Sequence, residues 1–219
     1  MRTIRAVAAT VATLAAATGC AAADGEHPLA GRSATTRQQL DHLTVAPAAD
    51  AGRYQRTTQF GSAWTLDSDR NGCRQRDDVL RRDLTAVRTS GRCTVVAGTL
   101  QDPYTGKTVQ FSKAHAAAVQ VDHVYPLGLA WRHGAAGWPQ QRRVQFANDL
   151  DLNLIAVDGP TNESKGDKGP GQWLPPRRDE WCDYAERYVR VAAAYDLSIT
   201  AADRKALITA FITCPGGAS

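Results

Sequence analysis

The sequence predicts an α+β fold, because segments with a helical period and short β-rich runs are mixed along the chain. The chain has 219 residues, which at roughly 150 residues per domain leaves room for one domain and a tail. Its hydrophobic residues (43%) and charged residues (22%) match ordinary globular usage, which excludes wholesale disorder and a fibrous repeat. We therefore expect one packed core.

A helical period first appears over 76–88, in the run RDDVLRRDLTAVR. Apolar residues three and four apart fall on one stripe, with arginines and aspartates opposite, which is typical of a packing helix. The stripe consists of Val79, Leu80, Leu84 and Val87. Further helices are expected over 126–133, 139–147, 178–195 and 200–213.

Short β-rich runs lie between these helices. The runs CTVVAGTL and KTVQF flank D-P-Y-T-G at 102–106, where proline and glycine provide turn chemistry, so the two runs predict a β-hairpin. Apolar runs over 119–124 and 152–157 predict two more strands. Strands and helices interleaved in this way give the α+β class.

The start of the chain has the pattern of a secretory signal, which we assign to 1–23. Arg2 and Arg5 precede an uncharged, alanine-rich run that is too short for a good membrane span. Cleavage after Ala23 would release a soluble extracellular protein. Cleavage before Cys20 is the alternative, and it would leave a lipid-modified cysteine as an anchor on the outer face of a bacterial membrane. Either cleavage means export.

The segment that follows, 24–53, is rich in Ala, Thr, Gln and Gly and has no sustained period. This composition predicts a disordered tether. The folded domain is then expected over 54–214.

Export places the remaining cysteines in an oxidising compartment. Of the three pairings that four cysteines allow, closeness in sequence favours Cys73 with Cys93 and Cys182 with Cys214, each worth roughly 3 kcal/mol. A zinc site is the rival interpretation, but its ligand pairs are normally about two to four residues apart. The spacing here favours disulfides.

The run D-S-D-R-N-G, which begins at Asp67, resembles the opening of a calcium loop. Oxygen-bearing side chains occupy alternate positions, a glycine is sixth, and Asp78 is twelfth. The twelfth position usually needs a longer glutamate, so a plain Asx/Gly turn is the competing interpretation of a structural Ca²⁺ site.

Polar residues interrupt two apolar strands in the middle of the chain. Asp122 and His123 end one strand, where a charge and an imidazole are costly unless they have partners. Asn153 interrupts the next strand, and Asn162 and Lys165 follow it. This spacing indicates two strands and a short helix that converge.

The pattern resembles the HNH (ββα-metal) nuclease family, and more closely the secreted DUF1524 branch related to the C-terminal domain of GmrSD-type restriction enzymes. The matching core is D-H-x-x-P-L, then N-L, then N-x-x-K. Branch features are Y-P-L-x-L-A-W, F-A-N-D, N-E-S-K-G-D and W-L-P-P, with D-P-Y-T-G and N-G-C-x-x-R-x-x-V-L upstream. The resemblance covers about 54–214. It implies a ββα-metal (His-Me finger) core with flanking helices and a β-hairpin, clipped by disulfides.

The resemblance implies a role for each matching residue. His123 would be the general base, and Asp122 a metal ligand. Asn153 would brace the loop and orient the histidine, and Asn162 would be the second metal ligand. An imidazole with a pKa near ~6.5 suits activation of water, and a carboxylate with an amide oxygen suits Mg²⁺ or Mn²⁺ better than zinc.

Four further residues are candidates. Asn148 and Asp149 are branch features that would brace the site or ligate the metal, and Lys165 and Lys168 would contact phosphate. Each candidate has a structural alternative: a hydrogen-bonded core histidine at His123, turn-forming asparagines, or solvated lysines.

Together these expectations predict a secreted, metal-dependent HNH endonuclease that hydrolyses DNA. RNA is the alternative or additional substrate. Without the two signal arginines the chain has 24 basic and 22 acidic side chains, so no broad basic surface and little sequence preference are expected. Nucleic acid is the implied partner, with no obligate protein partner. The alternatives are a non-catalytic cell-envelope or nucleic-acid-binding protein on the same scaffold, or a calcium-stabilised module.

Overall fold

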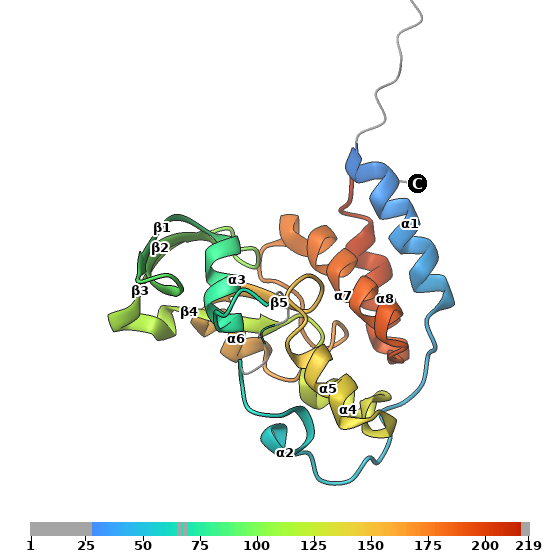
Figure 1. Ribbon diagram of the computed structural model, residues 1–219. Coiled ribbons are helices and arrows are strands. Elements are labelled where there is room, and N and C mark those ends of the chain that lie inside the picture. Colours follow the sequence, from blue (N-terminus) through green and yellow to red (C-terminus); the bar gives the residue numbers. More distant parts are fainter. Residues whose placement is uncertain (1–27, 65–66, 68–69, 216–219) are drawn as a thin grey trace, which may run out of the picture.

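The computed structural model describes residues 28–64, 67 and 70–215, and the α+β class is confirmed in these ranges (Figure 1). The signal peptide predicted over 1–23, with the alternative anchor residue Cys20, lies outside the described residues. Within the described part of the chain, no helix is long and apolar enough to cross a membrane.

Three antiparallel strands form a sheet in the order β1-β2-β3 at one end of the molecule (Figure 1). These strands are β1 (Leu84–Ser90), β2 (Thr94–Gln101) and β3 (Thr108–Ser112). Strands β2 and β3 are the predicted hairpin, which is confirmed. In its turn, the side chain of Asp102 accepts a hydrogen bond from the backbone N–H of Thr105 at 2.8 Å, and Gly106 has a φ of +68° that favours glycine.

Helix α3 (Gln75–Asp83) is shorter than the helix predicted over 76–88, because the chain becomes strand β1 at Leu84. Thr85, Val87 and Thr89 are β-branched residues at alternate positions, which favours a strand, and strand β2 pairs with Thr85 and Thr89. Leu84 keeps its predicted place in the core beside the apolar residues of α3. Tertiary pairing has overridden the helical period in the second half of this segment.

A second, two-stranded sheet carries the polar residues singled out above. It pairs β4 (Val119–His123) with β5 (Leu154–Asp158) antiparallel, and helix α6 (Gly159–Lys165) follows β5 directly. The remaining elements around this sheet are the 3-10 helix η1 (Lys113–Ala118), α4 (Leu127–Arg132), the 3-10 helix η2 (Ala135–Gly137) and α5 (Gln140–Ala147). The predicted strands and helices of this region are therefore confirmed.

The two faces of this small sheet pack against different hydrophobic clusters. In β5, Leu154 belongs to the cluster shared with α3 and the three-stranded sheet, whereas Ile155 belongs to the larger cluster under the C-terminal helices. Side chains alternate between the faces of a strand, so Asp122 and His123 in β4 point to opposite sides of the sheet. Both sides are mainly apolar, and each polar side chain therefore needs a specific partner.

The C-terminal part consists of η3 (Arg178–Glu180), α7 (Trp181–Tyr195) and α8 (Ala201–Phe211), which agrees with the two predicted helices. Both predicted disulfides are present. Cys182–Cys214 joins the start of α7 to the chain after α8, and Cys73–Cys93 joins the start of α3 to the start of β2.

The disordered tether predicted over 24–53 is ordered where the structure describes it. Helix α1 (Pro28–His42) lies alongside α7 and α8 (Figure 1). Leu40 is 1% exposed, and Thr36, one turn earlier on the same face, is 2% exposed. Few large apolar residues mark this helix in the sequence, so its stability comes from packing against the other helices and the prediction of disorder was wrong here.

Helix α2 (Arg56–Phe60) links this N-terminal part to the rest of the molecule. Phe60 is 1% exposed, and its ring centroid lies 6.1 Å from that of Tyr54 and 6.2 Å from that of Phe146 in α5. In addition, Arg143 donates a hydrogen bond from Nε to the backbone oxygen of Gln59 at 2.8 Å. The short helix is thus fixed against α5.

Candidate active site

The carboxylate of Asp122 is held by two partners from distant parts of the chain. The hydroxyl of Tyr104, in the hairpin turn, donates to Oδ2 at 2.6 Å, and Nζ of Lys165 in α6 donates to Oδ1 at 3.0 Å. Burial raises the pKa of the Asp122 carboxyl, while the charge of Lys165 and both hydrogen bonds oppose that rise. Asp122 therefore belongs to a buried ion pair and is 6% exposed.

The ammonium group of Lys165 makes its hydrogen bonds to groups inside the fold. Its side chain is 0% exposed, and Nζ also donates to the backbone oxygen of His123 at 2.9 Å. A phosphate could reach this group only by displacing the carboxylate of Asp122. The phosphate-binding role predicted for Lys165 is therefore corrected to that of a buried counter-ion.

The imidazole of His123 has a defined tautomer. Nε2 lies 2.9 Å from the backbone oxygen of Ala147, and because a carbonyl oxygen can only accept, Nε2 carries the proton. Burial lowers the pKa of His123 to about 3, and the charges of Arg56 and Lys165 add to this effect. The ring is therefore neutral at neutral pH, with the lone pair on Nδ1.

The indole ring of Trp64 covers the imidazole. The two ring centroids are 6.0 Å apart and the ring planes differ by 10°. Among the described residues, Nδ1 of His123 has no hydrogen-bond partner. The nitrogen that bears the lone pair is therefore available to a molecule in the adjoining cleft.

Asn153 fixes the backbone immediately after His123. Its side-chain oxygen accepts a hydrogen bond from the backbone N–H of Tyr125 at 2.9 Å, and its backbone oxygen accepts one from Val124 at 2.9 Å. Asn153 is 0% exposed. This geometry is that of a structural brace, and the orientation of the histidine through it stays a prediction.

Asn162 is positioned by the start of α6. The carboxylate of Asp158 caps this helix by accepting a hydrogen bond from the backbone N–H of Thr161 at 3.1 Å. Nδ2 of Asn162 donates to Oε1 of Gln120 at 2.8 Å, which fixes the amide orientation. In the described part of the chain Oδ1 has no hydrogen bond, so this oxygen is available as a ligand atom.

A cleft of about 370 Å³ brings three of the predicted residues together. Asp122, His123 and Asn162 all line it. Its other lining residues include Tyr54, Arg56, Glu163 and Asp167. Tyr54 and Arg56 were not predicted as site residues, because they precede the motif by more than sixty residues and no local pattern marks them.

The chain is also similar to a known protein family. The family model for the C-terminal domain of GmrSD restriction endonucleases matches residues 74–210. The chain belongs to this family. An uncharacterized secreted protein of the fungus Arthroderma benhamiae is 41% identical over 184 residues, covering 83% of this chain and 86% of the fungal one. No solved structure matches the chain.

The donors in the cleft of this GmrSD C-terminal family member fit a hard divalent cation. A carboxylate has about four acceptor positions; on Asp122 the hydroxyl of Tyr104 occupies one, and Nζ of Lys165, 3.0 Å from Oδ1 and 2.9 Å from Oδ2, occupies at most two. At least one position remains, and Oδ1 of Asn162 supplies a second oxygen. Among the described residues, no group of three histidine, cysteine or acidic ligands surrounds the cleft, so water and phosphate would complete the shell.

Two other predicted residues do not line the cleft of the GmrSD C-terminal domain. Oδ1 of Asp149 accepts from the backbone N–H of Leu152 at 2.9 Å, and Oδ2 accepts from the hydroxyl of Tyr195 at 2.6 Å. Nδ2 of Asn148 donates to the backbone oxygen of Val144 at 2.8 Å. For Asp149 both carboxylate oxygens accept hydrogen bonds, so bracing fits its contacts better than metal ligation. Oδ1 of Asn148 is buried and has no hydrogen-bond partner among the described residues, so both of its predicted roles stay predictions.

Lys168 is exposed, and its Nζ donates to the backbone oxygen of Ser164 at 2.7 Å. It is free to turn toward solvent, so its phosphate-binding role stays a prediction.

The calcium loop also stays a prediction. Asp67 accepts hydrogen bonds from the backbone N–H groups of Asn71 at 3.0 Å and Gly72 at 2.6 Å, which is an Asx-type turn, and 68–69 lie outside the described residues.

Proposed function

We propose that the protein is an exported, metal-dependent endonuclease that hydrolyses phosphodiester bonds of nucleic acid with little sequence preference. Membership of the GmrSD C-terminal family supports nuclease chemistry on a nucleic-acid substrate. The observation that carries the proposal is the neutral His123, whose Nδ1 is unbonded in the described structure and borders a cleft shared with Asp122 and Asn162.

The sequence of elements supports a ββα-metal (His-Me finger) core. Strands β4 and β5 pair antiparallel and α6 follows directly, so the histidine ends one strand and the second ligand lies on the helix. Asp122 and Asn162 would hold Mg²⁺ or Mn²⁺, which suit oxygen ligands. When bound, such a cation neutralises charge on the phosphate and on the leaving oxygen.

In the proposed reaction His123 acts as the general base. Nδ1 accepts a proton from water while the water oxygen bonds to phosphorus, and the bond from phosphorus to the leaving oxygen breaks as that oxygen gains a proton from solvent. The hydrogen bond from Nε2 to Ala147 keeps the base in the correct tautomer throughout. Tautomer control therefore comes from backbone and needs no further side chain.

The low pKa of His123, about 3, describes the protein without substrate. A base with such a low pKa is weak, but an anionic phosphodiester within a few ångströms favours the protonated imidazole and raises the pKa. Substrate binding would thus strengthen the base at the position where it is needed.

The small excess of basic residues supports low specificity, because sequence readers usually carry a large basic surface. Export is supported by the signal pattern at the start of the chain and by the fungal relative, which is named a secreted protein. A lipid anchor at Cys20 remains the alternative form of the same export.

The test is cleavage of plasmid DNA and of a structured RNA by the purified protein, with EDTA, Mg²⁺, Mn²⁺, Ca²⁺ or Zn²⁺. We expect nicking and linearisation of the plasmid with Mg²⁺ or Mn²⁺, and complete loss of cleavage with EDTA. Cleavage of the RNA is scored separately and decides whether RNA is also a substrate. A folded protein that cleaves neither polymer under any metal would overturn the proposal and favour a binding role. Cleavage that persists in EDTA would remove the metal from it.

A further inference from the structure

We propose that Arg56 binds the phosphate backbone of the substrate beside His123, so that the nucleic acid binds beside α2 and the cation beside α6. This inference rests on the proposed function and names the substrate-binding group. Arg56 is the first residue of α2 and lies outside the residues 74–210 that the family model matches. A segment ahead of the family domain would therefore complete the active site.

The position of Arg56 is fixed by its helix. Phe60, at the other end of α2, is 1% exposed and packs against Phe146, and Arg143 binds the backbone of the same helix. The guanidinium carbon of Arg56 lies 5.9 Å from the ring centroid of Trp64, and that ring stacks on the imidazole of His123. Guanidinium, indole and imidazole are consequently neighbours at one side of the cleft.

Arg56 is also a positively charged side chain that can bind a ligand in the cleft. It is exposed, and none of the salt bridges among the described residues includes it. Apart from His123, it is the single basic residue among the described residues that line the cleft. Lys165, in contrast, is buried against Asp122. A guanidinium offers a planar fork of donors that matches two phosphate oxygens.

The residues that line the cleft from α6 and just after it have the reverse charge. Glu163 on α6 and Asp167 just after it both line the cleft beside Asn162, and Asp167 packs close to Gly128. Carboxylates repel a phosphodiester and attract a divalent cation. The cleft is thus lined by a basic residue from α2 and by carboxylates from α6 and the residues just after it, together with His123.

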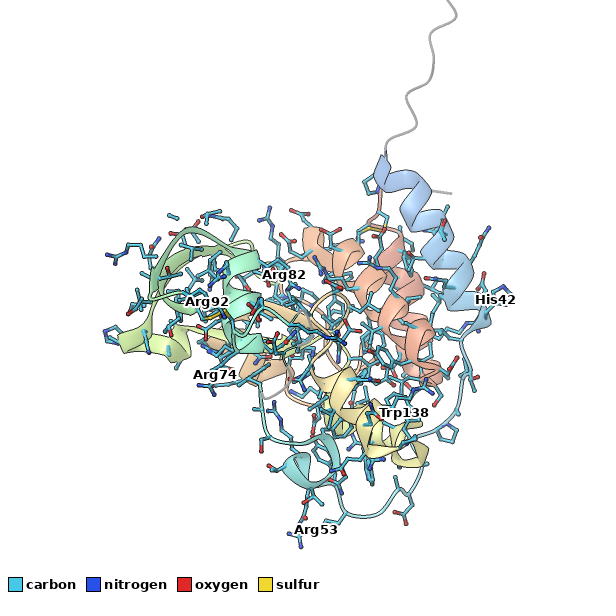
Figure 2. All side chains as sticks on the ribbon, viewed as in Figure 1. His42, Arg53, Arg74, Arg82, Arg92 and Trp138 are labelled. Atoms are coloured by element: carbon cyan, nitrogen blue, oxygen red, sulfur yellow. A yellow bond between two sulfur atoms is a disulfide. The ribbon has the colours of Figure 1, made fainter. Side chains whose placement is uncertain are left out.

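The test compares Arg56→Gln with the matched control Arg53→Gln, both made in the full chain carrying His123→Ala to prevent cleavage. Arg53 is exposed, belongs to the same segment, lies at the lower edge of the molecule (Figure 2), and is not among the residues that line the cleft. Binding of a short fluorescein-labelled DNA duplex is followed by anisotropy over a range of salt concentrations. Arg56→Lys, which keeps the charge and loses the fork, is a third variant.

We expect Arg56→Gln to weaken binding roughly ten- to hundred-fold and to reduce the slope of log K against log[salt] by about 0.9, the loss of one phosphate contact. Arg53→Gln should leave affinity and slope nearly unchanged, and Arg56→Lys should keep the slope with weaker binding. Equal effects of Arg56→Gln and Arg53→Gln, or no effect of either, would overturn the inference.

Failure of the inference and failure of the proposed function give different results. If the protein with His123 intact cleaves DNA and Arg56→Gln leaves kcat/KM unchanged, the inference is overturned while the nuclease function stands. If that protein does not cleave but Arg56→Gln weakens binding selectively, the phosphate site stands and the hydrolytic function is overturned. Equal melting temperatures of the variants exclude unfolding as the cause.

Discussion

At the scale of single residues, Asp122 shows which features of the site can be predicted from sequence and which cannot. Its position at the end of an apolar strand indicates from sequence that a partner is required. The partners themselves, Tyr104 and Lys165, lie 18 and 43 residues away and are brought together only by the tertiary fold. The need of Asp122 for a partner is therefore visible in the sequence, whereas its pairing with Lys165 is visible only in the fold.

Removing either partner of Asp122 should destabilise the fold by different amounts. Lys165→Met leaves a buried carboxylate without its counter-ion and is expected to cost about 3–5 kcal/mol of unfolding free energy. Tyr104→Phe removes one hydrogen bond to a charged group and should cost about 1–3 kcal/mol. Urea unfolding measures both.

Lys168→Met is the matched control for this pair, because Lys168 is exposed just beyond the same helix. Its effect should stay within about 0.5 kcal/mol. If Lys165→Met lowered the unfolding free energy no more than Lys168→Met does, the buried ion pair would not stabilise the fold.

The buried, neutral state of His123 predicts how the unfolding free energy depends on pH. Its pKa is about 3 in the folded protein and near 6.5 when unfolded, so between these values the unfolded chain binds a proton that the folded protein does not. The contribution of this residue is complete above pH 6.5 and declines as pH falls, by up to about 1.4 kcal/mol per pH unit. Between pH 7 and pH 5, the wild type should lose about 2 kcal/mol more than His123→Gln, which has no group to protonate. Urea titrations at the two pH values that gave parallel losses would contradict the buried, neutral imidazole.

At the scale of elements, strong local patterns were reliable and tertiary packing decided the rest. The hairpin, the two strands of the small sheet and the C-terminal helices each have a local signal and were predicted. The helix predicted from the stripe that begins at Val79 was too long, because the chain from Leu84 forms strand β1, in which Thr85 and Thr89 pair with β2. Helix α1 was missed because its stability depends on α7 and α8, which lie more than a hundred residues later in the chain.

The join between β5 and α6 sets the position of Asn162 and can be tested at Gly159. A Cβ atom there would overlap the backbone oxygen of Ala117, and a backbone atom cannot swing aside as a side chain can. Gly159→Ala should therefore displace the start of α6, lower the unfolding free energy by roughly 1–3 kcal/mol and reduce cleavage. Gly137→Ala is the control, since no atom lies within 4 Å of a Cβ added there, and its stability and activity should be unchanged. A harmless Gly159→Ala would show that α6 does not need this close contact.

At the scale of the whole molecule, the small β4–β5 sheet lies between two hydrophobic clusters, and one disulfide supports each side. Cys73–Cys93 ties α3 to the three-stranded sheet, while Cys182–Cys214 ties α7 to the end of α8. The site therefore lies at the junction of the two clusters. The cysteine pairing was predictable from spacing, but the burial of one side of the site by each cluster was not.

The charge distribution is also a property of the whole molecule. Basic and acidic residues nearly balance once the predicted signal is removed, so overall attraction to nucleic acid is weak. The motif residues of the cleft were found from sequence because they are closely spaced. Arg56 and Trp64 were not found, because only the folded chain places α2 beside β4.

The most direct measurement is the single-turnover rate of DNA cleavage by His123→Ala beside His115→Ala, at neutral pH with Mg²⁺ or Mn²⁺. His115 is an exposed histidine outside the cleft and controls for the loss of an imidazole elsewhere. We predict that His123→Ala lowers the rate about 10²- to 10⁴-fold while His115→Ala cleaves like the wild type. Cleavage by a folded His123→Ala at the wild-type rate would contradict the assignment of His123 as the general base.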